Sequence, residues 1–150
     1  MDQLQINTAL QIAKPITAVF EAITDPGQMS NYFIEEGSAP LKNQARVVWK
    51  FPEFDEHFPI DVVEVTAPNR IAFNWQGTRD AKTLVQINLL QMDPQTTLVK
   101  ISEGKLPANK AGLQWYGQNT EGWANFLVCL KAWVEHGVNL RKGAYDFMKI

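Results

Sequence analysis

The sequence has 150 residues, and its 14 Lys and Arg against 16 Asp and Glu give a formal net charge of −2, so we expect one domain over residues 1–150. Its 45% hydrophobic and 20% charged residues exclude a disordered chain, and the near-neutral charge argues against a nucleic-acid-binding protein. The single cysteine excludes an internal disulfide, and we find neither a signal peptide nor an apolar run long enough for a membrane span, which favours a soluble, cytoplasmic protein with no membrane association.

The first third of the chain predicts one strand and two short helices. Apolar and polar residues alternate over residues 4–12, which is typical of a half-buried strand that ends at Lys14-Pro15. Apolar residues at helical spacing then predict a short helix over residues 15–24. Asp25, a good N-cap, and Pro26 predict a second short helix that continues through Phe33.

From about residue 44 the pattern predicts strand after strand. Alternating or β-branched stretches occupy residues 47–51, 60–65, 71–76, 83–89 and 97–101, and Gly104 is expected to end the last strand. The connections are too short for parallel crossovers, so the strands should form an antiparallel meander.

The last predicted element is a long helix over residues 113–136, ended by Gly137. At 100° per residue, an apolar stripe includes Trp123, Phe126 and Leu130 and extends back to Trp115 and Tyr116. The element order predicts an α+β fold in which a curved antiparallel sheet of about six strands wraps around the long C-terminal helix.

This order resembles the helix-grip fold of the START and birch-pollen-allergen (SRPBCC) superfamily. Five segments resemble the branch similar to the C-terminal domain of the activator of heat-shock protein 90 ATPase: VFEAITDP (19–26), VVWKF (47–51), RIAFNW (70–75), TLVKISEG (97–104) and GWANFLVCLK (122–131). The resemblance implies a cavity between helix and sheet for apolar small molecules. Tyr32-Phe33 stands where the family often has Trp-Phe, and a chain of this length has no room for the activator's separate N-terminal domain, so chaperone activation is not implied.

Motifs for catalysis are not found. The three serines lie outside a G-x-S-x-G elbow, His57, His136 and Cys129 do not form a zinc set, and there is no Gly-rich phosphate loop. We therefore expect no catalytic residues, no metal and no cofactor, and we interpret Cys129 as a small buried hydrophobe.

An acidic stretch lies between Pro52 and Pro59. Its Glu53, Asp55, Glu56 and His57 could hold a divalent cation or work as an acid/base pair, but we interpret this stretch as a solvated hairpin tip. Phe54 and Phe58 within it either pack onto the sheet, which we favour, or form a partner surface or a pocket lid.

Two polar residues interrupt apolar patterns. Asn119 lies inside the helical stripe, where it either bonds backbone near the helix start or orients a ligand. Glu103 follows an alternating strand, and as a strand-end residue it is expected to reach water.

The leading hypothesis is non-catalytic binding of a small, mostly apolar molecule between the long helix and the sheet, in a monomer or homodimer. The predicted ligand-binding residues are Trp115, Asn119, Trp123, Phe126, Phe73, Trp75, Trp49 and Phe33. Alternatives are an interaction module for a protein partner, similar to the chaperone activator, and a cyclase-like enzyme with Asn119 or Glu103 as polar catalyst. Residues 138–150 either fold back or contact a second subunit.

Overall fold

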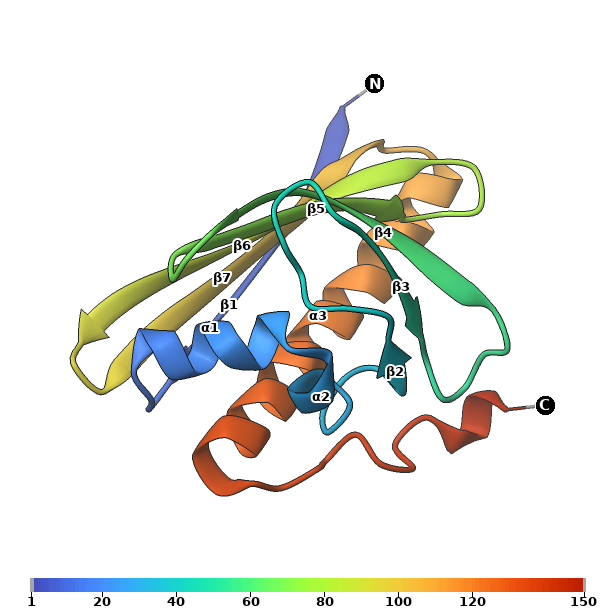
Figure 1. Ribbon diagram of the computed structural model, residues 1–150. Helices are drawn as coiled ribbons and strands as arrows, with labels where there is room; N and C mark the ends of the chain where they lie inside the picture. The colour runs from blue at the N-terminus through green and yellow to red at the C-terminus, as the bar shows by residue number, and fades with distance from the viewer. Residues whose placement is uncertain (1, 150) are drawn as a thin grey trace.

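A curved antiparallel sheet lies against one long helix in the computed structural model, which describes residues 2–149 (Figure 1). In chain order the elements are β1 (Gln3–Ile12), α1 (Ile16–Thr24), α2 (Pro26–Met29), β2 (Glu36–Gly37), β3 (Arg46–Lys50), β4 (His57–Thr66), β5 (Arg70–Gln76), β6 (Lys82–Asp93), β7 (Thr96–Pro107), α3 (Lys110–His136) and the 3-10 turn η1 (Asp146–Met148). The predicted α+β class and the antiparallel meander are confirmed.

The sheet has seven strands in the order β1-β7-β6-β5-β4-β3-β2. The additional strand, β2, pairs only Glu36 and Gly37 with β3, and two residues are too few to produce a periodic pattern. The predicted end of the last strand at Gly104 is wrong. β7 continues to Pro107 because Gly104 pairs with Leu84 on one side and, beside a register shift in β1, with Gln5 on the other.

The helix boundaries follow from their caps. The Asp25 carboxylate accepts a hydrogen bond from the Gly27 N–H at 2.9 Å, which starts α2 at Pro26. α2 ends at Met29, before the predicted end at Phe33, and the chain continues as a turn. The Asn109 side chain accepts from the Gly112 N–H at 2.8 Å and starts α3 at Lys110, three residues earlier than predicted.

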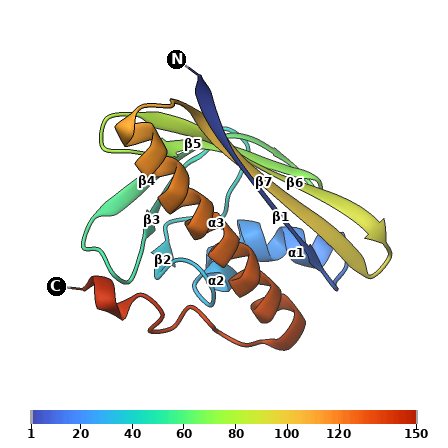
Figure 2. The same ribbon diagram turned by 180° about the vertical axis from the view of Figure 1, so that it is seen from behind.

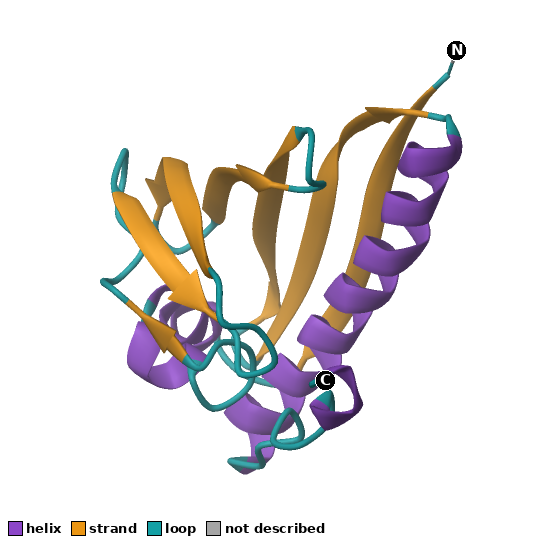
Figure 3. Ribbon diagram, turned by 90° about the vertical axis from the view of Figure 1, so that its right-hand side faces the viewer, coloured by secondary structure: helices purple, strands orange, loops and turns teal. Residues whose placement is uncertain are grey.

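α3 crosses the hollow of the curved sheet, as Figures 2 and 3 show. Trp115, Trp123, Phe126 and Leu130 are all buried against it, as the stripe predicts. The predicted place of Tyr116 on the buried face is wrong, because 39% of its surface is exposed. It lies about 100° around the helix from Trp115. The buried face is narrow in this first part of α3, where only Gly112 and Trp115 are buried, and it widens to include both Phe126 and Leu127 farther along.

The chain after α3 turns back toward the rest of the molecule. Gly137 adopts a left-handed conformation (φ 66°) that ends α3. Residues 138–149, called the C-terminal segment below, then run past α2 to the tip that joins β3 and β4 (Figures 1 and 2). None of the helices in residues 2–149 combines the length and apolar character that a membrane crossing requires.

Candidate functional site

The carboxylate of Glu103, on β7, is completely buried between the sheet and α3. Burying an ionised carboxylate costs several kcal/mol unless it is paired or hydrogen-bonded. Side chains of five residues donate hydrogen bonds to it, and we call this set the Glu103 network: Thr83, Trp75, Trp115, Asn119 and Trp123. The expectation that Glu103 reaches water is therefore wrong, because β7 does not end at Gly104.

Two donors of the network come from neighbouring strands. Trp75 on β5 faces Thr83 on β6 across the ladder. Trp75 Nε1 and Thr83 Oγ1 donate to Glu103 Oε2 at 3.1 and 2.5 Å. A Cβ added at Gly77 would lie 2.3 Å from Thr83 Oγ1 and 3.0 Å from Glu103 Oε2. The hairpin loop after β5 therefore approaches the network at a residue that has no side chain.

The other three donors lie on α3 at a spacing of four residues, which places them on one face of the helix. Trp115 Nε1 donates to Glu103 Oε2 at 3.2 Å, and Trp123 Nε1 donates to Oε1 at 2.8 Å. Asn119 Nδ2 lies between them, 3.1 Å from Oε1 and 3.3 Å from Oε2. Asn119 thus does not bond backbone near the helix start, because its amide N–H groups are directed to the acid.

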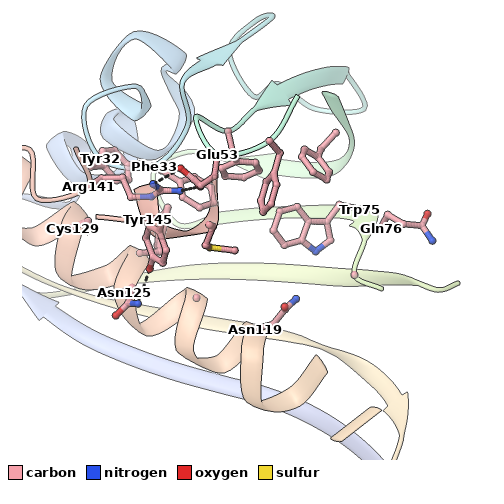
Figure 4. Close-up of a pocket in the computed structure, with 17 residues that line it drawn as sticks. Tyr32, Phe33, Glu53, Trp75, Gln76, Asn119, Asn125, Cys129, Arg141 and Tyr145 are labelled. Atoms are coloured by element: carbon pink, nitrogen blue, oxygen red, sulfur yellow. Dashed lines mark hydrogen bonds and ion pairs between the residues drawn. The ribbon is translucent and has the colours of Figure 1, made fainter. Parts of the chain in front are cut away.

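A pocket of about 310 Å³ opens beside this network. It lies between α3, the turn after α2, the β3–β4 tip and the C-terminal segment (Figure 4). Eight of its seventeen lining residues are aromatic: Tyr32, Phe33, Phe51, Phe54, Phe58, Trp75, Phe126 and Tyr145. A mostly apolar wall with a few polar groups is the usual composition of a small-molecule site.

The C-terminal segment is attached to the pocket by an ion pair. The guanidinium of Arg141 donates to both carboxylate oxygens of Glu53 in the β3–β4 tip, at 2.9 and 2.5 Å. The side chain of Glu53 is 5% exposed and that of Arg141 is 14% exposed, and such two-pronged pairs are among the strongest hydrogen-bonded contacts. The segment therefore folds back, and Glu53 is not part of a solvated tip as predicted.

A second contact lies next to this pair. The Arg141 guanidinium carbon is 4.3 Å from the centre of the Tyr145 ring. The Tyr145 hydroxyl accepts a hydrogen bond from Asn125 Nδ2 on α3 at 2.7 Å, and Figure 4 shows these residues at the same end of the pocket. The segment thus closes one side of the pocket between the β3–β4 tip and α3.

The predicted ligand-binding residues fall into three groups. Phe33, Trp75, Asn119 and Phe126 line the pocket. Trp123 lines a smaller recess of about 100 Å³ that shares Phe33, Trp75, Asn119 and Gly122 with it, and Trp115 lines a separate depression beside the loop after β5.

Trp49 and Phe73 form the third group, because both belong to the buried core and line none of these hollows. Their rings pack edge to face with centres 5.4 Å apart. Alternation along a strand identifies the inward face, but it does not distinguish a core position from a pocket wall.

Two titratable groups of the pocket wall are held neutral by burial. Burial raises the pKa of the Cys129 thiol, against a smaller opposite effect of Arg141, so Cys129 remains the small hydrophobe that the sequence predicts. Burial also raises the pKa of Tyr32 well above its usual value, and its hydroxyl donates to the Ala22 carbonyl at 2.7 Å.

Several residues of the pocket wall were not predicted from the sequence. Glu53 and Arg141 are 88 positions apart, and nothing in either local pattern indicates the other. A signal for the Glu103 network did exist. Two tryptophans, whose indole N–H can only donate, flank Asn119 at four-residue spacing on the inward helix face, which indicates a shared buried acceptor.

The comparisons with known proteins agree with this geometry. Residues 13–135 match the family described as activator of Hsp90 ATPase homolog 1-like protein. The chain belongs to this family. The SRPBCC helix-grip superfamily and the Aha1-like branch inferred from sequence are thereby confirmed. A search of curated proteins finds no match.

Solved structures with the same fold include protein SSP2350 from Staphylococcus saprophyticus, with a TM-score of 0.79, 28% identity and coverage of 92% of this chain and 96% of that chain. The Aha1 dimer from Colwellia psychrerythraea gives a TM-score of 0.75 at 14% identity, covering 89% and 98%. Protein BH1534 from Bacillus halodurans gives 0.74 at 20% identity, covering 90% and 100%. At such identities the last two show the fold alone. Family and fold together describe an SRPBCC-type ligand-binding or Aha1-like module.

Proposed function

We propose that this protein binds a small, mostly apolar molecule, without catalysis, in the pocket between α3, the β3–β4 tip and the C-terminal segment. The observation that carries the proposal is the pocket of about 310 Å³, in which eight of seventeen lining residues are aromatic. Large aromatic side chains offer extensive contact area at low conformational cost, and a few polar groups suffice to orient a ligand.

The pocket occupies one end of the interface between helix and sheet. Apart from the depression beside Trp115, the rest of that interface is filled by buried side chains such as Phe73, Val85 and Leu130. A ligand of this protein therefore lies close to Phe33 and Phe126, which the sequence analysis predicted.

Gly122 offers a sharp test because it lines both the pocket and the adjoining recess, and a Cβ added there meets no other atom within 4 Å. Gly122→Leu should fill the open space and weaken binding of a neutral apolar probe, N-phenyl-1-naphthylamine, at least tenfold. Saturable emission of the probe, titrated with wild type and variant, measures this.

Gly117 supplies the matched control. It also lies on α3 with free space at its Cβ, but it lines no pocket described here in residues 2–149. Both Gly→Leu variants should gain about 0.5–1 kcal/mol of helix stability, whereas only Gly122→Leu should lose the probe. Absence of saturable binding by the wild type, or equal binding by both variants, would refute the proposal.

A second candidate function rests on the family match: an interaction module for a chaperone of the Hsp90 class. The match covers residues 13–135. Retention of this class of chaperone by the immobilised protein, independent of Gly122→Leu, would favour it.

A further inference from the structure

The recess next to the main pocket is framed by aromatic rings and the Glu103 network. Phe33, Trp75 and Trp123 surround it together with Asn119 and Gly122, and its volume is about 100 Å³. The ring centres of Trp75 and Trp123 are 5.5 Å apart, and those of Phe33 and Trp123 are 5.9 Å apart. Four of the five residues also line the main pocket, so the two spaces adjoin.

The charge beside this recess is negative. Every donor to Glu103 is a neutral side chain, and none of the ion pairs among residues 2–149 includes Glu103. The other buried acid of the site, Glu53, is paired with Arg141. The ionised form of Glu103 therefore has no cationic partner among residues 2–149, in a poorly solvated region where electrostatic interactions are strong.

The tryptophan rings add to this potential. Trp75 and Trp123 each direct the positive N–H edge of the indole to Glu103. Their rings also contact each other, so a ligand reaches only the parts of the π-faces that border the recess. The faces of aromatic rings attract cations, tryptophan most strongly. Arg141, the cation of the main pocket, is occupied by Glu53 and Tyr145 on the side of the C-terminal segment.

Asn119 supplies a hydrogen-bond acceptor. Its Nδ2 donates to Glu103, which fixes the orientation of the amide. The carbonyl Oδ1 receives no hydrogen bond from any residue between 2 and 149. In Figure 4 the side chain rises from α3 toward Trp75. The recess thus combines an aromatic wall, a neighbouring negative charge and a free acceptor.

We infer that the ligand of the pocket is a cation: an apolar body in the main pocket that carries an alkylammonium group with N–H bonds in the recess. This inference rests on the proposed function and names the ligand class. The ammonium group would donate to Asn119 Oδ1, contact the faces of Trp75 and Phe33, and compensate the charge of Glu103.

The test compares three probes of equal length by calorimetric titration at neutral pH: n-octylammonium, 1-octanol and octanoate. An alkylammonium is protonated at this pH, as lysine is. Octylammonium should bind at least tenfold more tightly than octanol, and octanoate more weakly than octanol. Saturable octanol binding that equals or exceeds that of octylammonium would overturn the inference but leave the proposed function standing. Absence of binding by all three would overturn both.

Two variants test whether the preference for the ammonium arises at Asn119 and Glu103. Asn119→Ala should reduce octylammonium affinity at least threefold and octanol affinity by less, because the hydroxyl of octanol carries no charge. The control Asn125→Ala, in the same pocket wall, should change both ligands in parallel. Glu103→Gln removes the charge at nearly constant volume and should abolish the preference for the ammonium. Circular dichroism checks that Glu103→Gln folds. If it does not fold, the comparison of the two ligands in Asn119→Ala tests the inference. An unchanged preference in Asn119→Ala would overturn the inference.

Discussion

At the scale of single residues, two buried acids of this protein are stabilised by different means. Glu103 has only neutral donors, among them three indole N–H groups that cannot accept a proton and that match an ionised carboxylate. The carboxylate of Glu53 accepts hydrogen bonds from the positively charged guanidinium of Arg141. Glu53 thus has a cation beside it and Glu103 has none among residues 2–149, so the two ends of the pocket differ electrostatically.

Breaking the Glu53–Arg141 pair should loosen the C-terminal segment. Glu53→Gln keeps the shape of the side chain but removes the charge, at a cost of about 1.5 kcal/mol for the segment's attachment. Its open population should then rise roughly tenfold, and tryptic cleavage after Arg141 and Lys142 should accelerate by the same factor, since cleavage follows the open population. The time course of proteolysis measures this.

The control for that variant is Glu56→Gln, an exposed acid in the same tip. It carries the same change in net charge without touching Arg141, so its cleavage rate should stay that of the wild type. Equal rates for Glu53→Gln and wild type would mean that the ion pair does not hold the segment.

At the scale of elements, α3 serves both the core and the pocket. Its apolar face could be predicted because Trp123, Phe126 and Leu130 follow the helical period. Asn119 could be placed on that face, but the partner of its amide could not, because Glu103 belongs to a strand whose true length no local signal reveals. Periodicity defines a face, whereas a hydrogen bond requires the position of a second element.

The junction of α3 with the end of β1 is pH-dependent. Glu135 accepts from the Ala13 N–H at 2.8 Å and from Lys131, which also donates to the Gln11 carbonyl. Burial by itself would raise the pKa of Glu135, but the hydrogen bonds from Lys131 and Ala13 outweigh it and lower the pKa below its usual value. A lowered pKa stabilises the fold above the usual value, and that contribution is lost as the pH falls through the folded-state value.

Glu135→Gln should therefore lower the free energy of unfolding by about 1 kcal/mol at pH 7, with the deficit shrinking between about pH 5 and pH 3. Urea unfolding at pH 7, 5 and 3 measures the difference. Glu121→Gln, an exposed site on the same helix, should cost little at any of these pH values. A deficit for Glu135→Gln that persists undiminished at pH 3 would contradict the assignment.

At the scale of the whole molecule, the sequence predicts the order of helices and strands better than it predicts the long-range contacts that form the pocket. Alternation and capping predict most of the strands and helices because both signals are local, although they miss the two-residue β2 and the ends of α2 and β7. The pocket depends on the return of Arg141 and Tyr145 to the β3–β4 tip and to α3. Such a return requires the three-dimensional path of the chain, and no periodic pattern over residues 138–149 encodes it.

Because the C-terminal segment completes the pocket and not the core, its removal should have a limited effect on stability. Among residues 2–149, the fully buried core ends at Leu130, and Trp133 and Val134 are the last residues packed against it. A chain that ends at Gly137 should therefore keep its far-ultraviolet circular dichroism and its cooperative unfolding. It should lose about 1–2 kcal/mol, which lowers the melting temperature by about 3–8 °C. Thermal melting monitored by circular dichroism checks this, and a non-cooperative transition would show that the segment belongs to the core.

The Glu103 network also constrains how this protein can diverge. An apolar replacement of Glu103 alone would leave three buried indole N–H groups without an acceptor. Loss of one tryptophan would remove a donor from the Glu103 carboxylate. Positions 75, 103, 115 and 123 should therefore be inherited as a set. Descendants that lack the acid are expected to have exchanged the tryptophans in concert, so the four positions should co-vary across homologues.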